Sequence, residues 1–441
     1  MTTRMTVSTD LPFIIAPARP ALQDSPQRWW LALLLHFAML FLFVHRGGLS
    51  VAAPFLIEEL GLSKAVMGVL LSAFFWSYSL MQAPGGWAVD RFGVRRVYAC
   101  GLGLCSLAAA ATSLAGGLVS LIAARVLLGI GQSVTFPATT RAIANWFPDH
   151  QRGTVTACSN TGNRVGQVLV NGVGALLIAA IGWKVFFLGS GLLGLVWLLP
   201  WLLFLRRWDT PTKAVTTTPA TAPLASFLAG FALLKHRSFV GICLGYFAFD
   251  YTFYLLLTWL PGYLKLERGF STSEMALFSS VPYLANIPMM FETGILSDWF
   301  VRRGYNEIRV RKSFMIVGMI GGCLIVPAGM VEDRMTAVWL LTLTQCFIGM
   351  KGVIAFTLTM AVCEKRIVGA ASGLQNFSGQ IAGIISPALT GYIAHKTGSF
   401  ALAMGVAGAL LVVGILAYWL LVSEKVELSH EAQRVDRKMR A

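Results

Sequence analysis

The sequence places basic residues inside long apolar stretches, at Arg46, Arg125, Arg141, Arg164 and Lys351. Only two acidic residues, Asp250 and Glu292, lie clearly inside such stretches. A charge at membrane depth costs several kcal/mol unless it faces a partner or a polar cavity. The excess of buried cations therefore favours an anionic ligand that completes the pairing. Because the guanidinium fork donates two parallel hydrogen bonds to a carboxylate, we expect Arg46 and Arg125 to make the first contacts.

The apolar stretches that hold these charges are long enough to cross a membrane. Of the 441 residues, 56% are hydrophobic and 12% are charged, whereas soluble domains carry about 25% charged residues. A membrane helix needs roughly 20 apolar residues. Division at charged or turn-rich points predicts an all-α polytopic membrane protein with twelve transmembrane helices, roughly 30–56, 66–88, 96–116, 118–146, 153–181, 184–206, 238–264, 275–297, 313–331, 335–362, 367–394 and 400–422.

The distribution of positive charge orients these helices. Of the 35 Lys and Arg residues, 24 fall in the tails and loops on the side of the N-terminus, 6 fall on the opposite side, and five lie inside spans. The positive-inside rule places both termini in the cytoplasm. The net charge of +15 is spread over short loops, so nucleic acid is not an expected partner. We expect cytoplasmic tails at 1–28 and 423–441, six-helix bundles at 29–206 and 238–422, and a Pro- and Thr-containing linker at 207–237.

Each half carries a copy of one loop. The first reads Gly86-Trp-Ala-Val-Asp90-Arg91-Phe-Gly93-Val-Arg95-Arg96, and the second reads Gly294-Ile-Leu-Ser-Asp298-Trp-Phe-Val-Arg302-Arg303. A carboxylate beside cations at a helix end forms charge-assisted hydrogen bonds, which would break when the halves open. The expected gating residues are Asp90, Arg91, Arg95, Asp298 and Glu292, the last in an inner salt bridge with the second loop.

The first loop resembles the one between helices 2 and 3 of major facilitator superfamily transporters, and the two-half layout fits nearly the whole chain. Further segments resemble its anion:cation symporter branch: Leu49-Ser50-Val51-Ala52-Ala53-Pro54, Gly85-Gly86-Trp87, Trp146-Phe147-Pro148, 252–261 and 371–377. The resemblance implies pseudo-symmetric halves, with helices 1, 4, 7 and 10 lining a central path. It also implies carriage of organic anions such as sugar acids, aromatic carboxylates and phosphate, often with protons.

Polar residues at membrane depth need partners, which a hydroxylated substrate would supply. The expected substrate-binding residues are therefore Arg46, Arg125, Arg164, Tyr78, Gln82, Gln132, Tyr254, Lys351, Gln375 and Asn376. Structural roles stay open for three cations. Arg164 can pair with Asp250, Lys351 can snorkel or bond backbone carbonyls, and Arg141 can serve as a gate or topology residue.

Two acids typical of the resembling branch are missing. Helix 1 of that branch usually reads Asp-Arg, and helix 4 usually has an acid seven residues after its arginine; this chain has His45 and Gln132 there. Three hypotheses follow. The protein is a uniporter or exchanger; or His45, with a reference pKa of about 6.5, carries the proton; or Asp250 carries it, released to take a proton when the substrate arrives at a nearby arginine.

The sequence favours a secondary transporter for an organic anion, a sugar acid or another carboxylate, working by alternating access with proton-coupled uptake. We expect a monomer in the lipid bilayer of the inner membrane. The sequence contains no nucleotide-binding loop, nucleophile or metal constellation, and predicts neither cofactor nor enzyme activity. Alternatives are an anion exchanger or uniporter, or a receptor that binds without transport. An exporter of cationic drugs would need an acidic cavity, against the excess of bases.

Overall fold

The computed structural model describes residues 26–206, 231–363 and 368–423, and every element within them is a helix. The first part of the chain forms α1 (Arg28–Glu59), α2 (Lys64–Phe92), α3 (Val94–Thr112), α4 (Leu118–Ser133), α5 (Thr135–Trp146), α6 (Asp149–Leu169), η2 (Val170–Gly174), α7 (Ala175–Ile181) and α8 (Trp183–Arg206).

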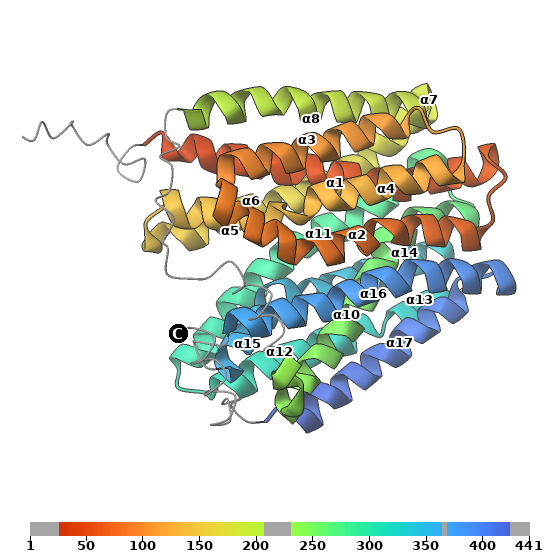
Figure 1. The fold of residues 1–441 in the computed structure, drawn as a ribbon. Helices are drawn as coiled ribbons and strands as arrows, with labels where there is room; N and C mark the ends of the chain where they lie inside the picture. The colour runs from red at the N-terminus through yellow and green to blue at the C-terminus, as the bar shows by residue number, and fades with distance from the viewer. Residues whose placement is uncertain (1–25, 207–230, 364–367, 424–441) are drawn as a thin grey trace, which may run out of the picture.

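The second part begins after the longest gap in the described residues. It forms η3 (Phe231–Lys235), α10 (Arg237–Leu266), α11 (Thr272–Arg302), α12 (Glu307–Gly322), α13 (Ile325–Met330), α14 (Arg334–Gly349), α15 (Lys351–Val362), α16 (Val368–Thr397), α17 (Ala401–Leu416) and η4 (Ala417–Leu421). In Figure 1 most of these helices lie below α1 to α8; most helices run across the view, and α10 and α17 are inclined to them.

Within the described residues, ten helical stretches are long and apolar enough to cross a membrane. The helices α11 and α16, 31 and 30 residues long, fall outside that set. Both contain polar side chains, Asn286 and Glu292 in α11 and Gln375 and Asn376 in α16, which lower their hydropathy. Twelve spans and cytoplasmic termini therefore stay predictions. Most of the expected tails and linker lies outside the described residues.

Several expected helices are interrupted rather than continuous. The helix expected at 335–362 is divided into α14 and α15 at Met350, so that Lys351 begins α15. The preceding residue, Gly349, lies against Asn286 of α11, and a Cβ at position 349 would come 2.6 Å from the Asn286 Cγ. Glycine also lowers helix propensity. The break thus lies next to a close contact between α14 and α11.

The two groups of helices meet along α2 and α16 and along α1 and α10. Gly68 and Gly391 face each other at the crossing of α2 and α16, where a Cβ on Gly391 would lie 2.9 Å from the Gly68 Cα. Nearby, Ser50 of α1 donates a hydrogen bond of 2.6 Å to the Thr258 carbonyl of α10. These contacts lie toward the end of the molecule at which α1 ends and α2 begins.

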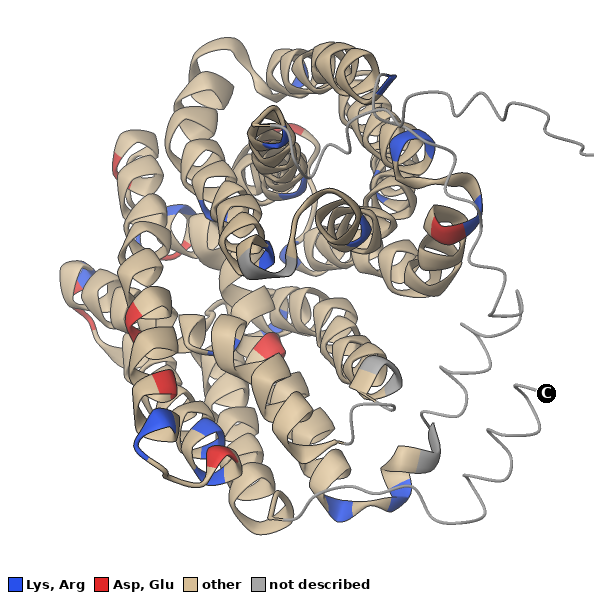
Figure 2. Cartoon of the chain, turned by 90° about the vertical axis from the view of Figure 1, so that its left-hand side faces the viewer, with Lys and Arg blue, Asp and Glu red and all other residues tan. Residues whose placement is uncertain are grey.

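Charged residues avoid the helix bodies. Figure 2 views the molecule from the left-hand side of Figure 1, along the helices, and Lys, Arg, Asp and Glu residues are few among the other residues of the helices. Buried apolar residues fill the interior in one large cluster that joins both groups of helices and a smaller one within the second group. The few charges inside the helix bodies are therefore enclosed by apolar and aromatic side chains.

Candidate functional site

Arg46 of α1 and Arg125 of α4 lie together in the interior, with 8% and 5% of their surfaces exposed. Arg125 donates hydrogen bonds to two backbone carbonyls of α1, from Nη1 to His45 at 3.4 Å and from Nη2 to Arg46 at 3.2 Å. Neither guanidinium has an acidic partner within 4.0 Å among the described residues. Arg46 Nη2 and Arg125 Nε are buried without any hydrogen-bond partner there. A buried guanidinium with free donors is suited to bind a carboxylate.

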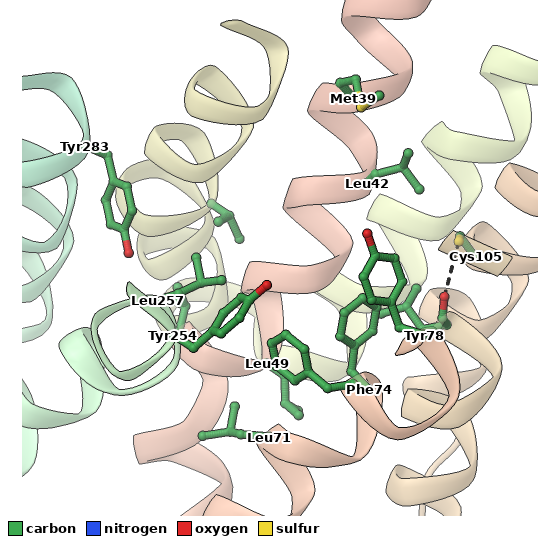
Figure 3. Packing of buried hydrophobic residues seen from close by; sticks show 14 of the residues in the cluster. Met39, Leu42, Leu49, Leu71, Phe74, Tyr78, Cys105, Tyr254, Leu257 and Tyr283 are labelled. Carbon is green, nitrogen blue, oxygen red and sulfur yellow. Dashed lines mark hydrogen bonds between the residues drawn. The ribbon is translucent and has the colours of Figure 1, made fainter. Parts of the chain in front are cut away.

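Aromatic rings enclose the Arg46 guanidinium. Its central carbon lies 4.9 Å from the ring centre of Phe74, 4.8 Å from that of Phe75 and 5.4 Å from that of Tyr254. Figure 3 shows Tyr254 of α10 pointing toward Phe74 and Tyr78 of α2. Ring faces attract the cation and hold its plane in place. The Nη2 of Arg46, which has no hydrogen-bond partner among the described residues, is the donor left for an anion.

A second charged cluster joins α10 to α15. Lys351 donates a hydrogen bond to the Asp250 carboxylate, and this ion pair links residues 101 positions apart. Asp250 is 2% exposed and is the one buried acidic residue in the described part of the chain. The Lys351 Nζ also lies 4.5 Å from the Tyr246 ring and 5.3 Å from the Phe253 ring.

This pairing decides between two sequence-based alternatives. Asp250 pairs with Lys351 and not with Arg164. The Lys351 ammonium therefore binds a carboxylate; it neither snorkels to the membrane surface nor bonds only backbone carbonyls. The break at Met350 explains the difference, because it sets Lys351 at the first turn of α15, which packs against α10.

Arg164 of α6 is the cation left over. Its guanidinium carbon lies 5.9 Å from the Phe253 ring, and no described residue makes a hydrogen bond or ion pair with it. The region around these residues thus holds four cations, Arg46, Arg125, Arg164 and Lys351, and one carboxylate, Asp250, in the described part of the chain. Charges enclosed by apolar side chains are costly without partners.

His45 points away from this cluster. Its Nε2 lies 3.1 Å from the Ser190 carbonyl of α8, and its ring is 1% exposed. Successive helix residues point about 100° apart, so Arg46 faces the aromatic rings while His45 faces α8. Gln132 of α4 is equally buried, and its Oε1 has no partner in the described part of the chain.

Some of the expected amide and phenol residues lie between the two groups of helices, and others make contacts within one group. Gln82 of α2 accepts a 2.7 Å hydrogen bond from Asn376 of α16, which joins the two groups of helices. Tyr78 lies 6.0 Å from the Arg46 guanidinium, so it belongs to the aromatic enclosure. Gln375 instead binds Thr359 of α15 at 2.5 Å, a contact within the second group.

Two of the expected gating carboxylates, Asp90 of α2 and Asp298 of α11, form ion pairs at the expected inner end. Asp90 lies 3.8 Å from Arg141, with both side chains largely exposed. Asp298 accepts a 2.7 Å hydrogen bond from Arg311, whose side chain is only 8% exposed. Arg311 was not anticipated, because nothing in the spacing between α11 and α12 marks it as the partner.

The other three expected gating residues, Glu292, Arg91 and Arg95, are not in these ion pairs. Glu292 is exposed and forms no ion pair with any described residue, so the expected salt bridge at Glu292 stays a prediction. It lies on α11 with its side chain turned outward, whereas Asp298 faces α12. Arg91 lies 5.9 Å from the Trp87 ring, and the Arg95 carbonyl accepts a hydrogen bond from Trp201 of α8.

The described residues contain no group of three His, Cys, Asp or Glu side chains able to hold a metal ion.

Helices that cross a membrane many times and enclose charged groups define a multi-pass membrane transport protein. The family model of the Major Facilitator Superfamily matches residues 35–387. The chain belongs to this superfamily, and it is a transporter rather than an enzyme.

Similar proteins include a D-galactonate transporter of Escherichia coli O6:H1, 30% identical, with 92% of this chain and 97% of that protein covered. A hexuronate transporter of Bacillus subtilis is 31% identical over 87% of this chain and 92% of its own length. Among solved structures, a bacterial homologue of the lysosomal transporter Spinster, inward-facing and unoccupied, has a TM-score of 0.74 at 19% identity, with 95% and 99% of the two chains covered. The last likeness concerns the fold alone.

Proposed function

We propose that this protein is a secondary transporter that takes up a small organic anion together with protons across the inner membrane. The observation that carries the proposal is the excess of cations inside the helices: Arg46 and Arg125, which are buried, and Arg164, which is partly exposed, have no acidic partner within 4.0 Å among the described residues. A carboxylate substrate supplies the missing negative charge. The proposed frame is twelve spans in two six-helix bundles, 29–206 and 238–422, with both termini cytoplasmic.

The relatives support the class of substrate. They are named as transporters of D-galactonate, hexuronate and, for a probable transporter of Cupriavidus necator that is 32% identical, sulfoacetate. All three compounds are small organic anions. In this proposal Arg46 and Arg125 bind the carboxylate, Tyr254 and Tyr78 enclose it, and the bonded pair Gln82 and Asn376 adjoins it.

Asp250 is the proposed proton carrier. An anion that enters near Arg46 and Lys351 competes with Asp250 for the Lys351 ammonium. Asp250, buried against Tyr246 and losing its counter-ion, then favours the protonated form, because burial penalises an unpaired carboxylate. The proton and the anion are thus bound together. His45 is the weaker candidate, since its ring faces α8.

Alternating access in this proposal opens and closes the two ends of the bundle in turn. Hydrogen bonds between the two groups of helices, such as Ser50 to Thr258 and Asn171 to Ser279 at 2.9 Å, lie toward the expected outer end. The ion pairs Asp90–Arg141 and Asp298–Arg311 at the expected inner end each stay within one group. This arrangement supports a conformation closed outside, with the inner end free to separate.

The test is uptake of D-galactonate and a hexuronate into proteoliposomes, with and without an inward proton gradient. We expect the wild type to accumulate substrate with the gradient, and Asp250→Asn to lose accumulation while it retains counterflow. The double variant Asp250→Asn with Lys351→Gln removes both charges and is expected to behave in the same way. Glu58→Gln, an exposed acid on α1, is the matched control and retains accumulation.

Two results would contradict this proposal. Transport indifferent to the gradient in wild type and variants would identify an exchanger or uniporter. Saturable binding without flux in sealed vesicles would identify a receptor on this fold.

A further inference from the structure

The charges of the interior do not balance when a single carboxylate binds. In the structure, before an anion binds, Lys351 is paired with Asp250, which leaves three positive charges, on Arg46, Arg125 and Arg164, and protonation of Asp250 on binding adds the charge of Lys351 to them. One carboxylate at Arg46 and Arg125 neutralises one of them. Arg164 then still lacks an acidic partner in the described part of the chain. Charged groups held among apolar side chains need partners.

The unpaired cations occupy two separate positions. Arg46 and Arg125, on α1 and α4, form the first pole, next to the Tyr254 ring. Arg164, on α6, forms the second pole, next to the Phe253 ring. The two rings are neighbours on α10, with their centres 5.3 Å apart. The two poles therefore lie against neighbouring rings of α10, and Arg164 is the second cation beside a ligand bound at the first pole.

We propose that the substrate carries two negative charges, one at each end, and that Arg164 is the specificity-determining residue that binds the second. The inference rests on the proposed transport of an anion and names its class more narrowly: a dicarboxylate, or an anion with a carboxylate and a second acidic group. Each end pairs with its own pole, so both poles are neutralised together. An anion charged at one end leaves Arg164 facing an uncharged group.

Two pairs of probes isolate the second charge. Galactarate and galactonate have the same six-carbon hydroxylated body, and only galactarate has a carboxylate at both ends. Succinate and butyrate form the same comparison without hydroxyl groups. We expect proteoliposomes to transport at least one diacid with a kcat/KM about tenfold or more above that of its matched monoacid.

Variants of Arg164 test its role directly. We expect Arg164→Gln to lower diacid kcat/KM about tenfold and to change that of the monoacid less than about threefold, so that the preference disappears. Arg164→Lys keeps the charge and restores most of the diacid preference. Lys396→Gln, which removes an exposed cation at the end of α16, retains it.

Two outcomes overturn the inference while transport itself stands. One is a monoacid carried as well as its diacid. The other is an equal loss of both substrates in Arg164→Gln, with the protein present at wild-type level, which would assign Arg164 a structural role. Lack of uptake of all four anions would count against the proposed function, and the inference would fall with it.

Discussion

At the scale of single residues, the adjacent residues His45 and Arg46 of α1 contact different parts of the molecule. Arg46 faces the rings of α2 and α10, whereas His45 binds the Ser190 carbonyl of α8. We expect His45→Gln, which keeps a donor near that carbonyl, to transport within about threefold of wild type and to keep its dependence on the proton gradient. Uptake rates measured from pH 5.5 to 8 check this expectation. Loss of gradient-driven accumulation in the variant would make His45 a proton carrier after all.

The role of Arg125 depends on the several donors of its planar guanidinium as well as on its positive charge. Two of its nitrogens donate to the carbonyls of residues 45 and 46, and Nε remains unpaired. A lysine keeps the charge but cannot bridge two carbonyls and also bind an anion. We expect Arg125→Lys to lower kcat/KM for the substrate at least about tenfold, at unchanged protein level in the membrane. Transport close to that of wild type would show that positive charge is sufficient.

Sequence reasoning identified the buried charges but not their partners. Arg46, Arg125, Arg164, Lys351 and Asp250 were all recognisable, because a charge in an apolar helix is conspicuous in any sequence. The pairing of Asp250 with Lys351 was not, since it joins two helices 101 residues apart and depends on the break before Lys351. No spacing along the chain carries that information.

At the scale of elements, α16 shows how one glycine supports the charged cluster. A Cβ on Gly379 would come 2.6 Å from Cε1 of Tyr246 and would also meet the Asp250 carboxylate. We expect Gly379→Ala to displace Asp250 from Lys351 and to reduce gradient-driven uptake at least about tenfold. The matched control is Gly373→Ala in the same helix, where a Cβ meets nothing within 4 Å. Equal uptake by the two variants would show that the position of Asp250 does not matter.

The helices were more predictable than their interruptions. Apolar length alone gave ranges that α1, α2 and α10 follow closely. It missed the break at Met350 and the π-helical turn η2, because local packing sets both. At the break, the absence of a side chain on Gly349 leaves room for Asn286. The turn η2 includes two glycines, Gly172 and Gly174, which allow an irregular backbone. Hydrophobic patterns do not register such contacts.

At the scale of the whole molecule, transport requires that the two groups of helices move against each other. Contacts between them toward the expected outer end include the crossing where Gly68 of α2 faces Gly391 of α16 and the 2.6 Å hydrogen bond from Ser50 of α1 to the Thr258 carbonyl of α10. Close approach of two backbones requires small residues on both sides. In our proposal, the packing of α2 against α16 at this crossing therefore closes the outer end.

A larger residue at this crossing is expected to keep the outer end from closing. A Cβ on Gly391 would lie 2.9 Å from both the Gly68 Cα and the Trp259 Cζ2, so Gly391→Val forces α2 away from α16. Accumulation and counterflow both require the outer end to close, and we expect both to fall at least about tenfold. This double loss separates Gly391→Val from Asp250→Asn, which keeps counterflow. Gly405→Val in α17, where a Cβ meets nothing within 4 Å, is the control. Normal counterflow in Gly391→Val would show that the molecule can exchange substrate without closing this crossing.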